Sequence, residues 1–154
     1  MIRQHLRPGH LASSGEKVTD RAVYRFFRDL GEYAPGLLVL CWGDHSSYMP
    51  LLRLKRLMGT ACDDPPRADL SRLRPTQARK TVAHLQLVSM LLRRFFDRDR
   101  SPVPVRLLDG REVMKVLKIP PGPRIGDILE RLREAQAEGT VLTRKAALEF
   151  IARF

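Results

Sequence analysis

Residues 107–132 read LLDGREVMKVLKIPPGPRIGDILERL and carry the clearest structural signals in the chain. Asp109 and Glu112 have the spacing of a helix capping box, in which each side chain accepts a hydrogen bond from the other residue's backbone N–H. This box predicts a short helix with an apolar side formed by Val113, Met114 and Leu117. The Pro- and Gly-rich segment 119–123 ends that helix and leads into a second one. Apolar residues recur at helical spacing along the second helix: Ile125, Ile128, Leu129 and Leu132.

Helix-capping and loop-forming residues on both sides of this stretch define a small C-terminal unit. Gly139 is expected to end the second helix. Thr143 is expected to cap a final helix, whose apolar side consists of Ala147, Leu148 and Ile151. Upstream, the segment Ser-Pro-Val-Pro at 101–104 is the clearest internal boundary. We therefore predict a helical tail over residues 105–154, preceded by a helical body over residues 1–100.

The body is also predicted to consist of helices, so the expected fold class is all-α. Thr19 is a plausible cap for a helix that ends at Gly31. The apolar run 37–42 fits a buried helix or a strand, and the preceding Pro35-Gly36 favours a helix start. Two further helices are predicted over residues 50–58 and 76–97. The apolar faces expected for them consist of Leu51, Leu54 and Met58 in the first, and of Val82, Leu85, Val88, Leu91, Leu92, Phe95 and Phe96 in the second.

Charge and composition restrict the class of protein. The chain has 154 residues, 44% of them hydrophobic, which excludes disorder of the whole chain. The run 37–42 is its longest apolar stretch, far short of the roughly 20 residues of a membrane-spanning helix. Cys41 and Cys62 make no disulfide framework, so a cytoplasmic location is expected. The aromatic residues lie mainly on predicted apolar faces and are expected to be core.

The chain is strongly basic. It contains 28 Lys and Arg against 17 Asp and Glu, a formal net charge of +11, and 22 of the basic residues are Arg. One arginine guanidinium can bind two phosphate oxygens at once, so this excess of arginine is typical of a nucleic-acid-binding surface. The alternative is a codon bias towards Arg in a high-GC genome. The charge is spread along the whole chain, which indicates a basic surface and not a basic arm.

Sequence motifs for catalysis are missing. The chain contains no P-loop, no GxSxG, no dinucleotide-binding fingerprint, no HExxH and no CxxC. Its four histidines, His5, His10, His45 and His84, do not have the spacing of a metal site. We therefore predict no catalytic residue, no metal and no cofactor in this chain.

One segment has the features of an anion site. Residues 119–126, IPPGPRIG, form a Gly-containing turn that enters a helix, where free backbone N–H groups and the helix dipole attract phosphate. Lys118 and Arg124 flank the turn and add positive charge. The alternative is a tight helix–helix turn, in which Gly126 permits close packing.

Four motifs in order, LLDGREVM at 107–114, IPPGPRIG at 119–126, LREAQAEG at 132–139 and TRKAA at 143–147, resemble the tail of bacterial CCA-adding tRNA nucleotidyltransferases and their poly(A) polymerase relatives. Upstream, HLRPGHL at 5–11, RFFRDLGE at 25–32 and residues 37–44 are similar to the end of that family's HD-type domain. The resemblance implies that the chain is the C-terminal portion of such a protein.

In that family the helical body and tail hold tRNA by its phosphate backbone. The resemblance therefore implies RNA contacts at Lys118, Gly122, Arg124 and Gly126. The charge pattern adds four further candidates: Arg111, Lys115, Arg79 and Lys80. The expected partner is tRNA or a tRNA-like RNA, recognised by shape because the deep major groove of A-form RNA excludes side chains.

The chain departs from the family in what it lacks. The nucleotidyltransferase head, with its glycine loop and paired aspartates, is absent, so Mg²⁺ and CTP or ATP would belong to that head. The first half of the HD-type domain is also absent, and His5 and Asp44 match only later positions of its metal site. We therefore expect no nucleotidyltransferase activity from this chain alone, and no metal site beyond a weak remnant.

Three alternatives remain open at this point. The chain could be a non-catalytic subunit that completes a separately encoded catalytic head. It could be a degenerate HD-type metal phosphohydrolase that uses His5, His10, Asp44 and His45. The third alternative is a homo-oligomer, because truncation of an HD-type domain would expose residues that belong to its core.

Overall fold

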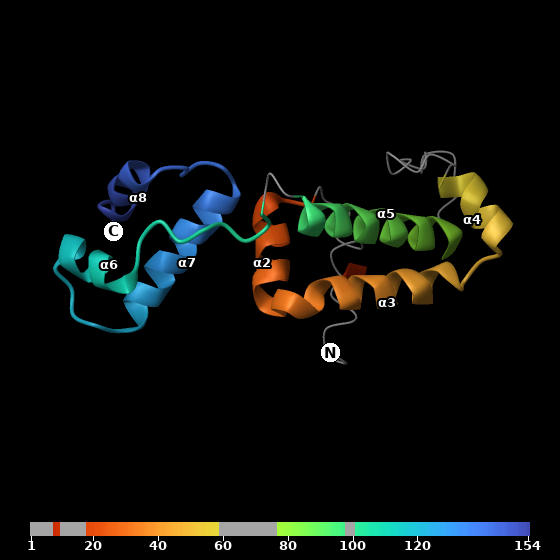
Figure 1. Cartoon of the computed structure of the whole chain (residues 1–154), viewed down its shortest axis with the longest axis horizontal. Coiled ribbons are helices and arrows are strands. Elements are labelled where there is room, and N and C mark those ends of the chain that lie inside the picture. The colour runs from red at the N-terminus through yellow and green to blue at the C-terminus, as the bar shows by residue number, and fades with distance from the viewer. Residues whose placement is uncertain (1–7, 10–17, 59–76, 98–100) are drawn as a thin grey trace. The chain divides into compact units, whose positions relative to one another are not determined.

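A computed structural model describes residues 8–9, 18–58, 77–97 and 101–154, and within these ranges it contains helices and no strand. The prediction of an all-α fold is confirmed (Figure 1). The helices are α2 (Asp20–Leu30), the 3-10 helix η1 (Gly31–Tyr33), α3 (Ala34–Ser46), α4 (Leu51–Met58), α5 (Gln77–Phe96), α6 (Gly110–Leu117), α7 (Pro123–Ala137) and α8 (Arg144–Ile151). None of these helices has the length and apolar character that a membrane crossing requires.

The chain packs as two compact units. The body unit lies within residues 1–18 and 30–101, and the tail unit consists of residues 19–29 and 102–154. The second break falls between Ser101 and Pro102, inside the predicted boundary segment. Most of α2 belongs to the tail unit, although it is far from the tail in sequence. The assignment of residues 1–100 and 105–154 as separate domains stays a prediction.

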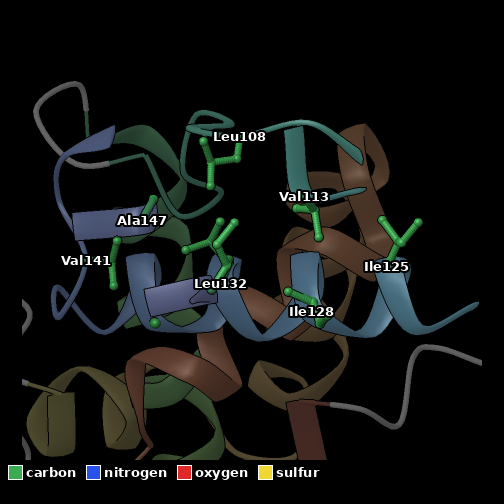
Figure 2. Packing of buried hydrophobic residues seen from close by; sticks show 9 residues of the cluster. Leu108, Val113, Ile125, Ile128, Leu132, Val141 and Ala147 are labelled. Atoms are coloured by element: carbon green, nitrogen blue, oxygen red, sulfur yellow. The ribbon is translucent and has the colours of Figure 1, made fainter. Parts of the chain in front are cut away.

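The core of the tail unit is formed by α6, α7 and α8 together with the segments that join them (Figure 2). The apolar residues predicted to face inwards on α7 do so, because Ile128 is 2% and Leu132 1% exposed. The buried residues of this core are Leu108, Val113, Ile125, Ile128, Leu132, Ala135, Val141, Ala147 and Ile151. Burial of these side chains is the main term that holds three short helices together.

Local capping fixes where the tail helices begin and end. The capping box is confirmed: Asp109 Oδ1 accepts from the Glu112 N–H, and Glu112 Oε2 accepts from the Asp109 N–H, both at 2.8 Å. Thr143 caps α8, because its hydroxyl oxygen accepts from the Ala146 N–H at 3.2 Å. Gly139 has a φ of +77°, and this left-handed conformation turns the chain after α7.

In the body unit, α3 packs along α5. The run 37–42 is helical, as its Pro35-Gly36 start indicated, and Pro35 lies in the first turn of α3. Leu37, Leu38 and Cys41 form the buried side of α3. The long helix α5 buries four of its predicted apolar positions: Val82, Leu85, Val88 and Leu91.

Several expectations for the body were wrong. Leu51 was expected to share a buried face with Leu54, but Leu51 is 63% exposed whereas Leu54 is 3% exposed. Helix α4 has eight residues, and among its described side chains Leu54 joins the small cluster of Met49, Val82 and Leu85. The Met58 side chain, expected on the same face, lies outside the described side chains. The aromatic side chains are not all core either, since the following are exposed: Tyr33, Tyr48 and Phe96. These residues lie at helix ends or between helices, where periodicity does not indicate which side is covered.

The tail core predicts a large difference between two leucines of the same unit. Leu132→Ala is expected to lower the free energy of unfolding by about 2–5 kcal/mol, because it removes a fully buried side chain and leaves a cavity. Leu142→Ala is the matched control, since Leu142 is 74% exposed, and should change stability by less than about 0.5 kcal/mol. Urea denaturation followed by circular dichroism measures both values. Equal effects of the two substitutions would contradict this packing.

Candidate nucleic-acid interface

Lys118 has an unusual backbone conformation. It caps the C-terminus of α6 with φ 54° and ψ 39°, and it is the one described residue other than glycine with a positive φ. A side chain in this left-handed region is disfavoured by roughly 1 kcal/mol, and glycine is the usual residue at such a position. The Lys118 side chain is exposed. A lysine held here at the expense of stability is a candidate for a functional role.

Three basic residues form a row on α6 and its cap. Arg111, Lys115 and Lys118 are four and three residues apart, so they lie on one side of the helix. All three are exposed. Within the described ranges none of them has an acidic partner. This row, here called the α6 row, is therefore free to meet an anion.

The start of α7 follows directly. Gly122 precedes the helix with an extended backbone, φ 172°, and has no side chain to accept from the first N–H groups of α7. A Cβ at Gly122 or Gly126 would meet no atom within 4 Å. The alternative that Gly126 serves close helix packing is therefore wrong, and both positions face open space.

Arg124 uses some of its hydrogen-bond donors within the tail unit. Its Nη2 donates to the carbonyl oxygen of Phe154 at 2.8 Å, and the side chain remains exposed. The Arg131 guanidinium lies over the Phe154 ring, 5.5 Å from its centroid. A guanidinium has five N–H donors, so Arg124 still has donors for an anion at the start of α7.

The last two predicted RNA contacts lie in the other unit. Arg79 and Lys80 are exposed in the first turn of α5. The six remaining candidates, Arg111, Lys115, Lys118, Gly122, Arg124 and Gly126, belong to α6, the following loop and the start of α7. The RNA-binding role of all eight residues stays a prediction.

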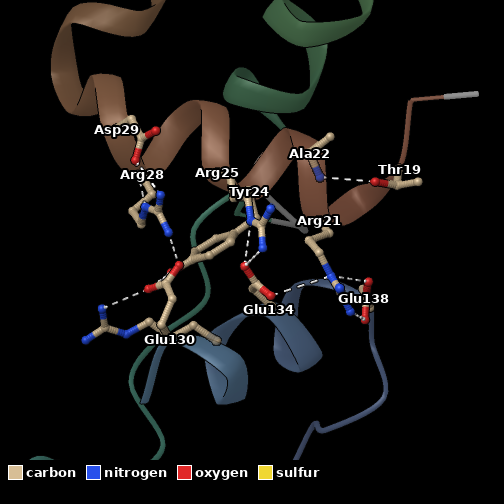
Figure 3. A network of polar contacts seen from close by, with 11 residues as sticks. Thr19, Arg21, Ala22, Tyr24, Arg25, Arg28, Asp29, Glu130, Glu134 and Glu138 are labelled. Carbon is tan, nitrogen blue, oxygen red and sulfur yellow. Dashed lines mark hydrogen bonds and ion pairs between the residues drawn. The ribbon is translucent and has the colours of Figure 1, made fainter. Parts of the chain in front are cut away.

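Three arginines of α2 are paired with Glu130 and Glu134 of α7 and with its C-cap residue Glu138 (Figure 3). Arg21 Nε lies 2.8 Å from Glu138 Oε1, and Arg25 Nη2 lies 2.5 Å from Glu134 Oε1. Arg28 pairs with Glu130, which also accepts from the Tyr24 hydroxyl at 3.3 Å. We call this set the Arg–Glu ladder.

The ladder was not anticipated from the sequence. The sequence does contain a pattern that could have indicated the ladder: the arginines recur at helical spacing, and the glutamates recur every four residues. The Glu134 side chain is only 9% exposed, so its carboxylate depends on the arginines for hydrogen bonds. Hydrogen bonding to Glu138 raises the pKa of Arg21. These arginines serve the fold and are not free for phosphate.

Of the residues considered for a metal, Asp44 and His45 lie in the described part of the chain, and both contact other side chains. Asp44 accepts a hydrogen bond from the Tyr48 hydroxyl at 3.0 Å. The His45 ring stacks on His84 of α5, with centroids 3.5 Å apart and an interplanar angle of 15°. Imidazole lone pairs lie in the ring plane, so two stacked rings do not point at one ion. His5 and His10 lie outside the described residues, and within the described ones no three His, Cys, Asp or Glu could hold a metal.

The stacked histidines are part of the body core. His84 is 3% exposed, and burial, followed by the neighbouring His45, lowers its pKa to about 4. Burial also lowers the pKa of His45, against the opposing effect of Asp44. In the described part of the chain, His45 Nδ1 and His84 Nε2 have no hydrogen-bond partner. The pair therefore packs as neutral rings at neutral pH.

Comparison with known proteins relates part of the chain to tRNA nucleotidyltransferases. Over 56 residues it is 43% identical to the A-adding tRNA nucleotidyltransferase of Deinococcus radiodurans, which covers 36% of this chain and 13% of the relative. This chain is similar to tRNA nucleotidyltransferases over about a third of its length. The CC-adding enzyme of Thermus thermophilus is 47% identical over 53 residues, 34% of this chain and 12% of the relative.

A third relative agrees with the first two. The CC-adding tRNA nucleotidyltransferase of Geobacter sulfurreducens is 43% identical over 47 residues, 30% of this chain and 11% of the relative. The matched part thus spans 11–13% of the length of these curated relatives. No protein-family model matches the chain. No solved structure matches it either.

The Arg–Glu ladder predicts a specific coupling energy. Arg25→Ala is expected to lower the free energy of unfolding by about 1–3 kcal/mol, because it leaves a buried carboxylate short of a partner. Combining it with Glu134→Gln should cost less than the sum of the two single changes. Lys145→Ala is the control, since it removes an exposed charge of the same unit outside the ladder. Additive effects in a double-mutant cycle would contradict the pairing.

The stacked histidines predict how stability depends on pH. The folded pKa of His84, about 4, lies below the unfolded value of 6.5, so the unfolded chain takes up a proton first as the pH falls. Stability should therefore be lost between pH 6.5 and about 4, by up to about 3 kcal/mol from this residue. His84→Phe keeps a stacking ring without the titration and should flatten this part of the profile. Denaturation at several pH values measures it, and an unchanged profile would contradict the assignment.

Proposed function

We propose that the chain is the C-terminal, RNA-binding portion of a tRNA nucleotidyltransferase or poly(A) polymerase relative. It binds tRNA or a tRNA-like RNA through the phosphate backbone and does not itself add nucleotides. The similarity to A-adding and CC-adding tRNA nucleotidyltransferases supports the choice of RNA. In this proposal Mg²⁺ and CTP or ATP belong to a catalytic head outside this chain.

The observation that carries the proposal is the division of positive charge within the tail unit. Arg21, Arg25 and Arg28 are neutralised by the Arg–Glu ladder, and Arg144 pairs with Glu112. The α6 row has no such partners among the described residues. Charges that the fold does not use are the ones available to a polyanion.

The binding surface has a second component in the start of α7. Its N–H groups carry the positive end of the helix dipole and follow the α6 row in the chain. Gly122 and Gly126 leave this end open, so a phosphate could approach the backbone closely. Arg124 adds guanidinium donors at the same end. Arg79 and Lys80 of α5 would contact the RNA from the body unit.

A cytoplasmic location is part of this proposal. Cys41 is buried and is not part of a disulfide in the described structure, as expected for a protein of a reducing compartment. The residues Asp44 and His45 do not form a phosphohydrolase site in the described structure, so the metal-enzyme alternative has no structural support.

Binding should be tested by titrating labelled tRNA with the purified chain at about 50 and about 200 mM salt, beside an unrelated duplex RNA. We expect tighter binding to tRNA than to the duplex and a steep loss of affinity with salt. Incubation with CTP and ATP should give no incorporation. Equal, weak binding to both RNAs would contradict the proposal and favour the partner-subunit alternative.

Lys118→Gly separates binding from folding in the same assay. Glycine relieves the left-handed conformation, so thermal stability should stay equal or rise. The tRNA affinity should fall several-fold, and the salt dependence should decrease by roughly one phosphate contact. Lys55→Ala is the matched control, because it removes an exposed lysine from α4 and should leave affinity within about twofold. An equal loss in both variants would indicate a general charge effect and not this site.

A further inference from the structure

Helix α3 is apolar on both of its sides. Its inner side, Ala34, Leu37, Leu38 and Cys41, is buried. Its outer side has Val39 61%, Leu40 60% and Trp42 37% exposed. A helix that is apolar all round is normally covered all round. Among the described residues of the body unit, nothing covers this outer side of α3.

The outer face of α3 is defined by Gly36, Val39, Leu40 and Gly43. These positions are spaced by three or four residues, so they form one continuous strip along the helix. The strip carries no charged side chain, and a Cβ at Gly43 would meet no atom within 4 Å. Contiguous exposed apolar surface of this kind marks an interaction site.

The strip has a two-fold pattern in its own sequence. About a midpoint between Val39 and Leu40, Gly36 is the counterpart of Gly43, and Val39 is the counterpart of Leu40. Two copies packed antiparallel would place glycine opposite glycine and a branched aliphatic side chain opposite another. Such self-complementarity is what a two-fold interface between identical chains requires.

The charges at the two ends of α3 favour the same arrangement. Glu32 is exposed just before α3, whereas Arg53 and Arg56 are exposed on α4, just after it. An antiparallel pair opposes the two helix dipoles and brings Glu32 of one copy towards the end of α3 that leads to Arg53 and Arg56 in the other. Asp44 is also exposed near that end, where its carboxylate accepts a hydrogen bond from the Tyr48 hydroxyl, so the arginines outnumber the acidic residue by one. A parallel pair would bring the like charges together.

We propose that the outer face of α3 pairs with the same face of a second copy of this chain, antiparallel and about a two-fold axis between Val39 and Leu40. The uncharged strip lets two copies with a net charge of +11 each meet where repulsion is smallest. Leu51 and Leu52 of α4 are exposed as well, at 63% and 66%. The inference is independent of RNA binding by the tail unit.

The test is sedimentation of the full chain between about 1 and about 100 µM, without RNA. The wild type should form a dimer in this range. Leu40→Glu places a charge at the axis and should weaken the dimer at least about tenfold. Leu142→Glu is the matched control, because Leu142 is 74% exposed in the tail unit and its substitution should leave the dimer intact. Circular dichroism confirms that each variant is folded.

A second variant tests the direction of pairing. Glu32→Arg should weaken the dimer, and the loss should shrink at high salt, because it replaces an attraction between the ends of α3 by a repulsion. A wild type that stays monomeric at about 100 µM would overturn the proposal. A dimer that survives Leu40→Glu would also overturn it, as would a dimer that is lost equally in Leu142→Glu. A wild-type monomer that binds a different apolar protein through α3 would overturn it in favour of the partner-subunit alternative.

Discussion

Helix α7 holds the tail unit together because it satisfies two different demands at once. Its apolar residues, Ile128 and Leu132 among them, are buried in the core formed with α6 and α8. Its glutamates bind the arginines of α2 through the Arg–Glu ladder. A carboxylate as buried as that of Glu134 is stable only with such partners, so the position of α2 within this unit follows from the chemistry of α7.

The ladder also changes the meaning of the net charge. A formal charge of +11 suggests an evenly basic protein, but several arginines are neutralised within the tail unit. Arg111, Lys115 and Lys118 are left over on one side of α6. Lys118 in addition occupies a conformation that glycine would adopt at lower cost. The proposed RNA surface rests on this contrast between used and unused charge, more than on the total.

The body unit differs from the tail unit, because the notable exposed surface of the body unit is apolar and not charged. Helix α3 buries one side against α5 and exposes Val39, Leu40 and Trp42 on the other. Between α3 and α5, the rings of His45 and the buried His84 are stacked. In the Asp44-His45 dipeptide, the His45 ring stacks on His84 and the Asp44 carboxylate accepts a hydrogen bond from the Tyr48 hydroxyl.

Short-range signals were enough to place the helices. Asp109 with Glu112, Thr143, Gly139 and Pro35 act on neighbouring backbone groups, so their effect can be read from residues a few positions apart. The same reading failed for Leu51, because periodicity states which residues share a side and not whether that side is covered. The Arg–Glu ladder joins residues 102–117 positions apart, and its partners became neighbours only through the packing of the unit. Whether a charged side chain is exposed or paired depends on that packing. The candidate RNA-binding residues could therefore be named from the sequence, but only the tertiary structure distinguishes the paired basic residues from the unpaired ones.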